Sequence, residues 1–179
     1  MRPLILSCFI FISLCLNAQE QVLIKNGQAY DSSKFSKFVQ NLHDQNEFVI
    51  LFRTLMPDSV SDKYFILTQS SNQFAAFELE PYTENKLPRK ISQENLLMIW
   101  KNLLQNEIFS LRNEKELSNF CALKYDIYDS YTYEFTILSK PSMKVLSYYN
   151  PEYYDEVCYG LPERKKIINA ASAFAFYWK

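Results

Sequence analysis

The chain of 179 residues contains very little glycine and histidine, and both shortages exclude whole classes of chemistry. Only two glycines are present, Gly27 and Gly160. Walker and Rossmann turns need several glycines within a few residues to bring backbone amides around a phosphate, so neither turn is present. The single histidine, His43, excludes zinc motifs with paired histidines, and no two cysteines have the C-x-x-C spacing. We therefore expect no metal site and no cofactor.

Long runs of charge of one sign are also missing. The chain carries 19 basic and 20 acidic residues, a formal net charge of −1. Proteins that bind nucleic acid concentrate lysine and arginine to neutralise phosphates. The one compact basic group, residues 164–166, lies beside Glu163 in a predicted helix and is explained by a solvent-exposed helix face. No nucleic-acid partner is expected.

The first 18 residues have the order of a secretory signal peptide. A positively charged start is followed by an apolar run over residues 4–16 and by the small residue Ala18. The apolar run is shorter than the roughly 20 residues that a spanning helix needs. The alternatives are an uncleaved anchor and a lipoprotein, although Cys15 lacks the preceding Gly or Ala of a lipobox. We expect an exported protein, periplasmic or secreted, of bacterial type.

Removing 18 of the 179 residues leaves 161, enough for one domain (residues 19–179) with a sizeable core. Two cysteines remain, Cys121 and Cys158, and an even pair in an oxidising compartment indicates a disulfide. Two buried free thiols and a reactive cysteine are the alternatives. No integral membrane span is expected after cleavage, and the oligomeric state is not predicted.

Apolar residues at helical spacing predict three helices, at residues 33–45, 93–108 and 162–178. Ser92 is a suitable N-cap for the second, and Pro162 suits the first turn of the third. His43, near the end of the first helix, is expected on the surface. The second helix should bury one stripe, composed of Leu96, Leu97, Trp100, Leu103, Leu104 and Ile108.

About six strands are predicted between these helices. The stretch 81–90 is interpreted as a loop, and the segment 153–159 as irregular. Because the strands follow one another without crossover helices, they indicate an α+β fold: a mostly antiparallel sheet with the helices on one face. The strands are expected at 21–25, 48–52, 64–68, 74–79, 121–128 and 131–138, with a hairpin turn at 140–142 leading to a further paired segment.

The last hairpin has a register that can be predicted from alternation. Large residues occupy odd positions up to Ile137, so a three-residue turn at 140–142 keeps odd positions inward by pairing Ile137 with Val145. This register places Tyr148 on the opposite, charged face together with Glu134.

Tyrosine is concentrated in one part of the chain: nine of the 13 fall within about 35 residues. Several fill inward positions, but Tyr128, Tyr148, Tyr153 and Tyr154 do not. With Glu134 they form the predicted binding surface, since exposed tyrosines stack on sugars and anchor protein partners. The alternative is that a helix covers this face.

These observations favour a small exported, non-catalytic binding or interaction protein with a protein or glycan partner. One alternative is a cell-envelope enzyme with dispersed carboxylates such as Asp126 and Glu134. Another is a structural accessory component of an envelope assembly. A non-catalytic role is favoured over catalysis because no catalytic motif is present.

Overall fold

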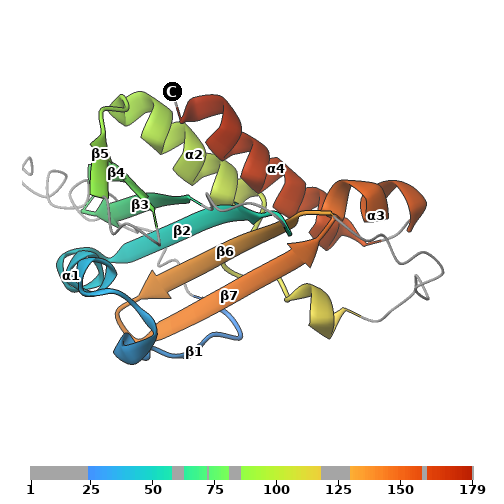
Figure 1. The fold of residues 1–179 in the computed structure, drawn as a ribbon, viewed down its shortest axis with the longest axis horizontal. Coiled ribbons are helices and arrows are strands. Elements are labelled where there is room, and N and C mark those ends of the chain that lie inside the picture. The colour runs from blue at the N-terminus through green and yellow to red at the C-terminus, as the bar shows by residue number, and fades with distance from the viewer. Residues whose placement is uncertain are drawn as a thin grey trace, which may run out of the picture.

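The computed structural model describes residues 24–57, 63–71, 73–80, 86–117, 130–158 and 161–178. In this part of the chain, a seven-stranded antiparallel sheet with the order β1-β7-β6-β2-β3-β4-β5 forms the centre of the molecule (Figure 1). The expected α+β class is confirmed. The strands are β1 (Gln28–Ala29), β2 (Phe48–Leu55), β3 (Tyr64–Ser70), β4 (Gln73–Leu79), β5 (Lys86–Arg89), β6 (Thr132–Ser139) and β7 (Ser142–Tyr149).

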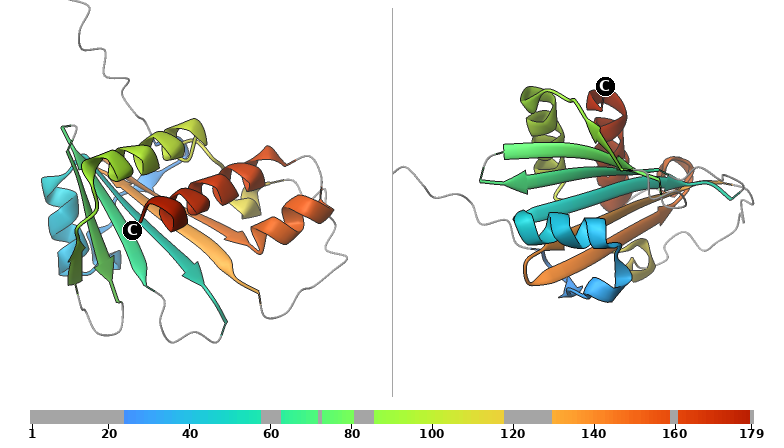
Figure 2. Two further views of the ribbon diagram at one scale, coloured as in Figure 1. Left: turned by 90° about the horizontal axis from the view of Figure 1, so that it is seen from above. Right: turned by 60° about the vertical axis from the view of Figure 1, so that its left-hand side comes forward.

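Helices cover both faces of the sheet. α2 and α4 lie on one face, and α1 lies on the other (Figure 2). The expectation that all helices share one face is wrong, because the middle strands are apolar on both sides: residues 49–52 of β2 are all buried. The described helices are α1 (Lys37–Gln45), α2 (Gln93–Gln105), α3 (Pro151–Val157) and α4 (Pro162–Tyr177), with 3₁₀ turns η1 (Ser32–Lys34) and η2 (Glu114–Glu116).

Local signals set where the helices begin. The hydroxyl of Ser36 accepts the backbone N–H of Val39 at the start of α1, and Ser92 caps α2 in the same way. The first helix therefore begins later than the predicted residue 33, after the separate turn η1. The second ends at Gln105, and it buries Ile99 in place of Leu97 and Leu104, which are 37% and 38% exposed.

Two hydrophobic cores result, one on each side of the sheet. The larger core packs α2 and α4 against the sheet side that carries Phe52 and Phe135, while the smaller one packs α1 against the side that carries Leu51 and Leu138. Successive strand residues point to opposite faces, so neighbouring residues of β2 serve different cores. The sheet is thus the middle layer of three.

The β6–β7 register differs from the prediction by one residue. Ile137 lies opposite Lys144 and Phe135 opposite Leu146, with a two-residue turn at 140–141. The even positions of β7 therefore face α2 and α4. One of them, Lys144, is charged but only 6% exposed, and its ammonium donates to the carbonyl of Lys25 at 2.7 Å.

Two segments interpreted as loop or irregular have regular structure. Residues 86–89 form the edge strand β5, which contains Pro88 and is exposed along its whole length, so it has no hydrophobic alternation to reveal it. The aromatic segment after Asn150 forms α3, with Pro151 in the first turn. The predicted strand at 121–128 lies outside the described residues, as do residues 21–23 of the one predicted at 21–25; residues 24 and 25 are described and are not part of a strand.

A buried ion pair joins α4 to η2 and β7. Arg164 is 7% exposed, and its Nε lies 3.3 Å from Oε1 of Glu114. The other oxygen of Glu114 accepts the backbone N–H of Tyr149 at 2.9 Å. The basic group at 164–166 is therefore not simply a solvated face, because its first member is part of the interior.

Candidate functional site

The structure does not bring the described members of the predicted tyrosine surface together on one face. Tyr148 is fully buried at 0% exposure, and its hydroxyl donates to the carbonyl of Arg112 at 2.5 Å. Tyr154 is 8% exposed in α3, and Tyr153 packs edge-to-face on it with 5.4 Å between ring centres. Tyr128 lies outside the described residues. The assignment of Tyr148 to the charged face was wrong because it depended on the incorrect β6–β7 register.

Glu134 lies on the α1 side of the sheet, away from Tyr148. Its Oε1 accepts from Nε and Nη2 of Arg53 at 2.8 and 2.7 Å. The same guanidinium lies 4.7 Å from the ring centre of Tyr64. Glu134 is thus half of a cross-strand ion pair, and the other predicted carboxylate, Asp126, lies outside the described residues.

His43 is buried and not on the surface as expected. Its side chain is 5% exposed, its ring stacks on Tyr30 at 3.8 Å, and its Nε2 is hydrogen bonded to the carbonyl of Ser139 at 2.8 Å. The contact fixes the ring between α1 and β6. This geometry gives His43 a packing role.

The structure places a cavity of about 560 Å³ between the first turn of α1 and the sheet. Phe38 and Val39 form the helix side of its wall, and Leu51, Tyr64 and Leu79 form the sheet side. The cavity exists because α1 covers only part of this face of the sheet. The apolar first turn of α1 lies over the strands, and side chains of both the helix and the strands face the cavity. A wholly or partly apolar molecule fits these walls.

The charged side chains that line the cavity are all lysines. Three lysines line it, Lys34, Lys37 and Lys86, and there is no carboxylate among the described lining residues, although Nζ of Lys34 lies 3.9 Å from the carboxylate of Asp31. The ammonium of Lys86 lies 5.1 Å from the ring centre of Phe38. The first turn of α1 adds backbone N–H groups without helical acceptors, which carry the positive end of the helix dipole.

Sequence reasoning missed this site. Apolar spacing predicted the helix at residues 33–45 but gave no binding role to it. Lys37 and Lys86 are 49 residues apart in the chain, and no spacing relates them. Only the pairing of β5 with β4, which brings Lys86 opposite Leu79, makes them neighbours.

A second polar group lies near the other end of the sheet. The hydroxyls of Tyr131 and Tyr133 both donate to the carboxylate of Glu152, the second at 2.7 Å. Burial, followed by the hydrogen bond to this carboxylate, raises the pKa of Tyr131 to about 12 and raises the pKa of Tyr133 further. Tyr133 also lines a smaller cavity of about 270 Å³ with walls of Phe52, Phe65, Phe174 and Trp178, among others.

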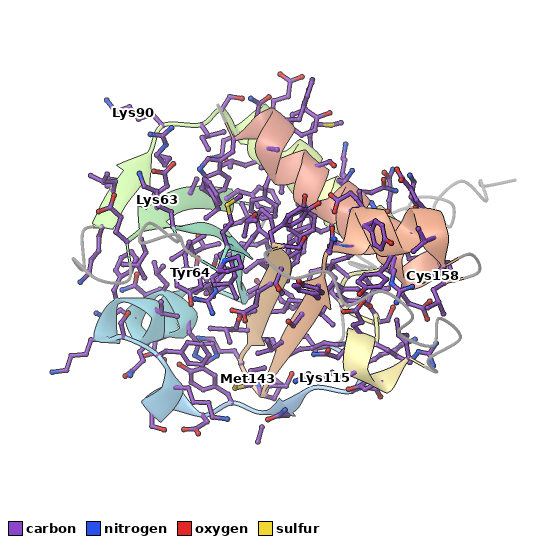
Figure 3. The ribbon with its side chains drawn as sticks, turned by 45° about the vertical axis from the view of Figure 1, so that its right-hand side comes forward. Lys63, Tyr64, Lys90, Lys115, Met143 and Cys158 are labelled. Atoms are coloured by element: carbon purple, nitrogen blue, oxygen red, sulfur yellow. The ribbon has the colours of Figure 1, made fainter. Side chains whose placement is uncertain are left out.

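The predicted disulfide is only half within the described residues. Cys158 is 8% exposed at the end of α3, far from Tyr64 in the cavity wall (Figure 3). Cys121 lies outside them. Cys158 is disulfide-bonded and not a free thiol, whereas its pairing with Cys121 stays a prediction.

No protein-family model matches the chain, and no curated protein or solved structure has significant similarity to it. Within the described ranges, none of the helices has the length and apolar character required to cross a bilayer. The same ranges contain no cluster of three or more histidine, cysteine, aspartate or glutamate side chains arranged to hold a metal ion.

Proposed function

We propose that this protein is an exported, non-catalytic binding protein whose cavity beneath α1 takes a small apolar molecule with an anionic head group, such as a medium-chain carboxylate. The observation that carries the proposal is the combination of apolar walls with Lys34, Lys37 and Lys86. A neutral apolar ligand would need no lysines, and a cationic one would be repelled by them.

The dimensions and energies agree with such a ligand. The cavity of about 560 Å³ falls in the range of about 300–1,000 Å³ typical of small-molecule sites. Burial of the tail contributes about 25 cal/mol per Å² of apolar surface, whereas an ion pair with a solvent-exposed lysine contributes about 0.2–1 kcal/mol. The tail therefore supplies most of the affinity, and the lysines supply selectivity for the head group.

Three ligands with the same tail separate these contributions: decanoate, decanol and decyltrimethylammonium. Isothermal titration calorimetry on the protein starting at Gln19 should give the tightest binding for decanoate, weaker binding for decanol and the weakest for the cation. A nitroxide-labelled carboxylate should broaden the amide NMR signals of residues 34–39 before all others. Equal affinities for the three head groups would contradict the proposal.

Removal of the lysine charges tests the same point in the protein. The double variant Lys37→Gln/Lys86→Gln should weaken decanoate binding about 2–20-fold and leave decanol binding unchanged, because only the head group loses partners. Lys165→Gln is the matched control, since that side chain is 66% exposed on α4. A similar loss in the control would show that net charge, and not the cavity, governs binding.

Export and the disulfide are part of the proposal. Residues 1–18 have the features of a signal peptide, and an oxidising compartment would make a Cys121–Cys158 bridge chemically reasonable. Expression of the full chain in a bacterium should yield a mature protein whose N-terminal sequence begins at Gln19. A retained Met1 on the exported protein would disprove cleavage.

A further inference from the structure

A second binding feature lies on the outer side of α2 and α4, on the opposite face of the sheet from the α1 cavity. The two helices are antiparallel: Nδ2 of Asn95 donates to the carbonyl of Tyr177 at 3.4 Å, and Nδ2 of Asn169 donates to Oδ1 of Asn106 at 3.2 Å. The hollow of about 560 Å³ between them extends over residues 169–177 of α4, about 12 Å at the rise of an α-helix.

Uncharged side chains, most of them polar, line this groove in two facing rows. No charged side chain is among the described lining residues. The hollow forms where α4 carries Ser172 and Ala173, because these side chains are too small to fill the space beside α2. The rows are composed of Asn102, Gln105 and Asn106 on α2, and Asn169, Ser172, Ala173, Phe176 and Tyr177 on α4.

An internal hydrogen-bond chain orients the amides. Nδ2 of Asn106 donates to Oδ1 of Asn102 at 3.0 Å, and Oδ1 of Asn106 accepts from Asn169. Asn102 and Asn169 thus each use one polar group of the side-chain amide in these hydrogen bonds. The donor Nδ2 of Asn102, the acceptor Oδ1 of Asn169 and the amide of Gln105 have no protein partner in the part of the chain that the structure describes. These groups present both donors and acceptors.

An aromatic ring stands at one end of the same groove. Phe176 is 66% exposed, far more than any other large apolar side chain on α4, and its ring centre lies 4.8 Å from that of Tyr177 in an edge-to-face contact. An exposed phenyl ring gives a ligand a flat apolar surface at little entropic cost. The groove therefore combines an apolar platform with neutral donors and acceptors.

We propose that this groove binds a neutral oligosaccharide. Hexose rings have apolar C–H faces that pack on an aromatic ring, and adjacent hydroxyls that both donate and accept, which matches the phenyl ring of Phe176 and the paired amides. The absence of charge among the described lining residues selects against acidic sugars, which would need a cation. The site is independent of the α1 cavity, because the sheet lies between them.

Saturation-transfer difference NMR with maltotetraose, cellotetraose and the anionic tetragalacturonate tests this assignment. At least one neutral tetrasaccharide should bind saturably, and tetragalacturonate should bind much more weakly. Phe176→Ala should weaken the neutral ligand about fivefold or more. Gln105→Ala should weaken it about two- to fivefold.

Leu97→Ala is the control, because this α2 side chain is 37% exposed and does not line the groove. Its affinity should equal that of the unmodified protein. Melting curves establish that each variant is folded. If Phe176→Ala does not fold, the affinity of Gln105→Ala decides the test. Failure of both neutral probes to bind, equal binding of tetragalacturonate, or an unchanged affinity in the folded groove variants would overturn the proposal. None of these results depends on decanoate binding.

Discussion

Tyr148 provides the most direct test of the interior of this fold. Its side chain is 0% exposed in the larger core, whereas its neighbour Tyr149 points to the opposite side of β7 and is only partly buried. Two tyrosines adjacent in sequence therefore make opposite predictions. Replacing each in turn reports which face of the strand is inside.

The expected magnitudes follow from burial and hydrogen bonding. Tyr148→Ala removes a large aromatic side chain from a packed core, which costs about 3–5 kcal/mol. Tyr148→Phe keeps the ring but leaves the carbonyl of Arg112 without the 2.5 Å hydroxyl contact, which costs about 1–3 kcal/mol. Tyr149→Ala should cost clearly less than Tyr148→Ala, because its ring is half-buried at the surface of the sheet.

Equilibrium unfolding in urea measures these differences, with the free energy of unfolding extrapolated to water. The slope against denaturant should stay constant, which shows that the variants change stability and not the extent of the native structure. The order Tyr148→Ala, Tyr148→Phe, unmodified protein should hold from least to most stable. A larger loss for Tyr149→Ala than for Tyr148→Ala would refute the observed register and restore the one predicted from alternation.

Three further perturbations test other parts of the structure. Burial raises the pKa of Tyr133 and Tyr148 above the ordinary value of about 10, so above pH 10 the unfolded chain loses protons that the folded chain keeps. The free energy of unfolding should therefore fall as pH rises, by about 1.4 kcal/mol per pH unit for the fully buried Tyr148. Absorbance at 295 nm should show the ionisation of Tyr148 only on unfolding. Arg164→Met should lower the free energy of unfolding in urea by about 2–4 kcal/mol, because the carboxylate of Glu114 stays partly buried without its partner. An unchanged free energy of unfolding would contradict the buried ion pair. The exported protein should resist iodoacetamide until reduced, and Cys121→Ser/Cys158→Ser should cost about 3–4 kcal/mol if the bridge forms, whereas alkylation of the unreduced, denatured protein would disprove it.

Local sequence signals predicted α1, α2, α4 and most described strands well, since their causes are short-range, but they missed α3. Ser92 and Pro162 mark helix starts through caps and backbone geometry that need no tertiary contact. The hairpin around Ser71 follows from the same reasoning, because two apolar runs flank a polar turn. These features depend on residues a few positions apart.

The errors came from interactions between distant segments. Lys144 carries a charge, but carbonyls of the segment before β1 and of the segment after α2 hold its ammonium inside. The turn has two residues and not the predicted three, so the alternation of β7 is reversed and Tyr148 lies in the core and not on the charged face. Neither partner segment is near residue 144 in the chain, so no local pattern could have identified the contact.

The same physical cause explains why the candidate sites were not visible in the sequence. A sheet that is apolar on both faces needs helices on both, and α1, with nine residues, is too short to cover its face completely. The uncovered strip between the first turn of α1 and strands β2 to β5 becomes the cavity. Its lysines are brought there by strand pairing. On the opposite face two longer helices cover the core, and the polar groove lies on their outer side, where only helix-to-helix packing brings the amides together. Each site is thus a consequence of how completely its helices cover one face of the sheet.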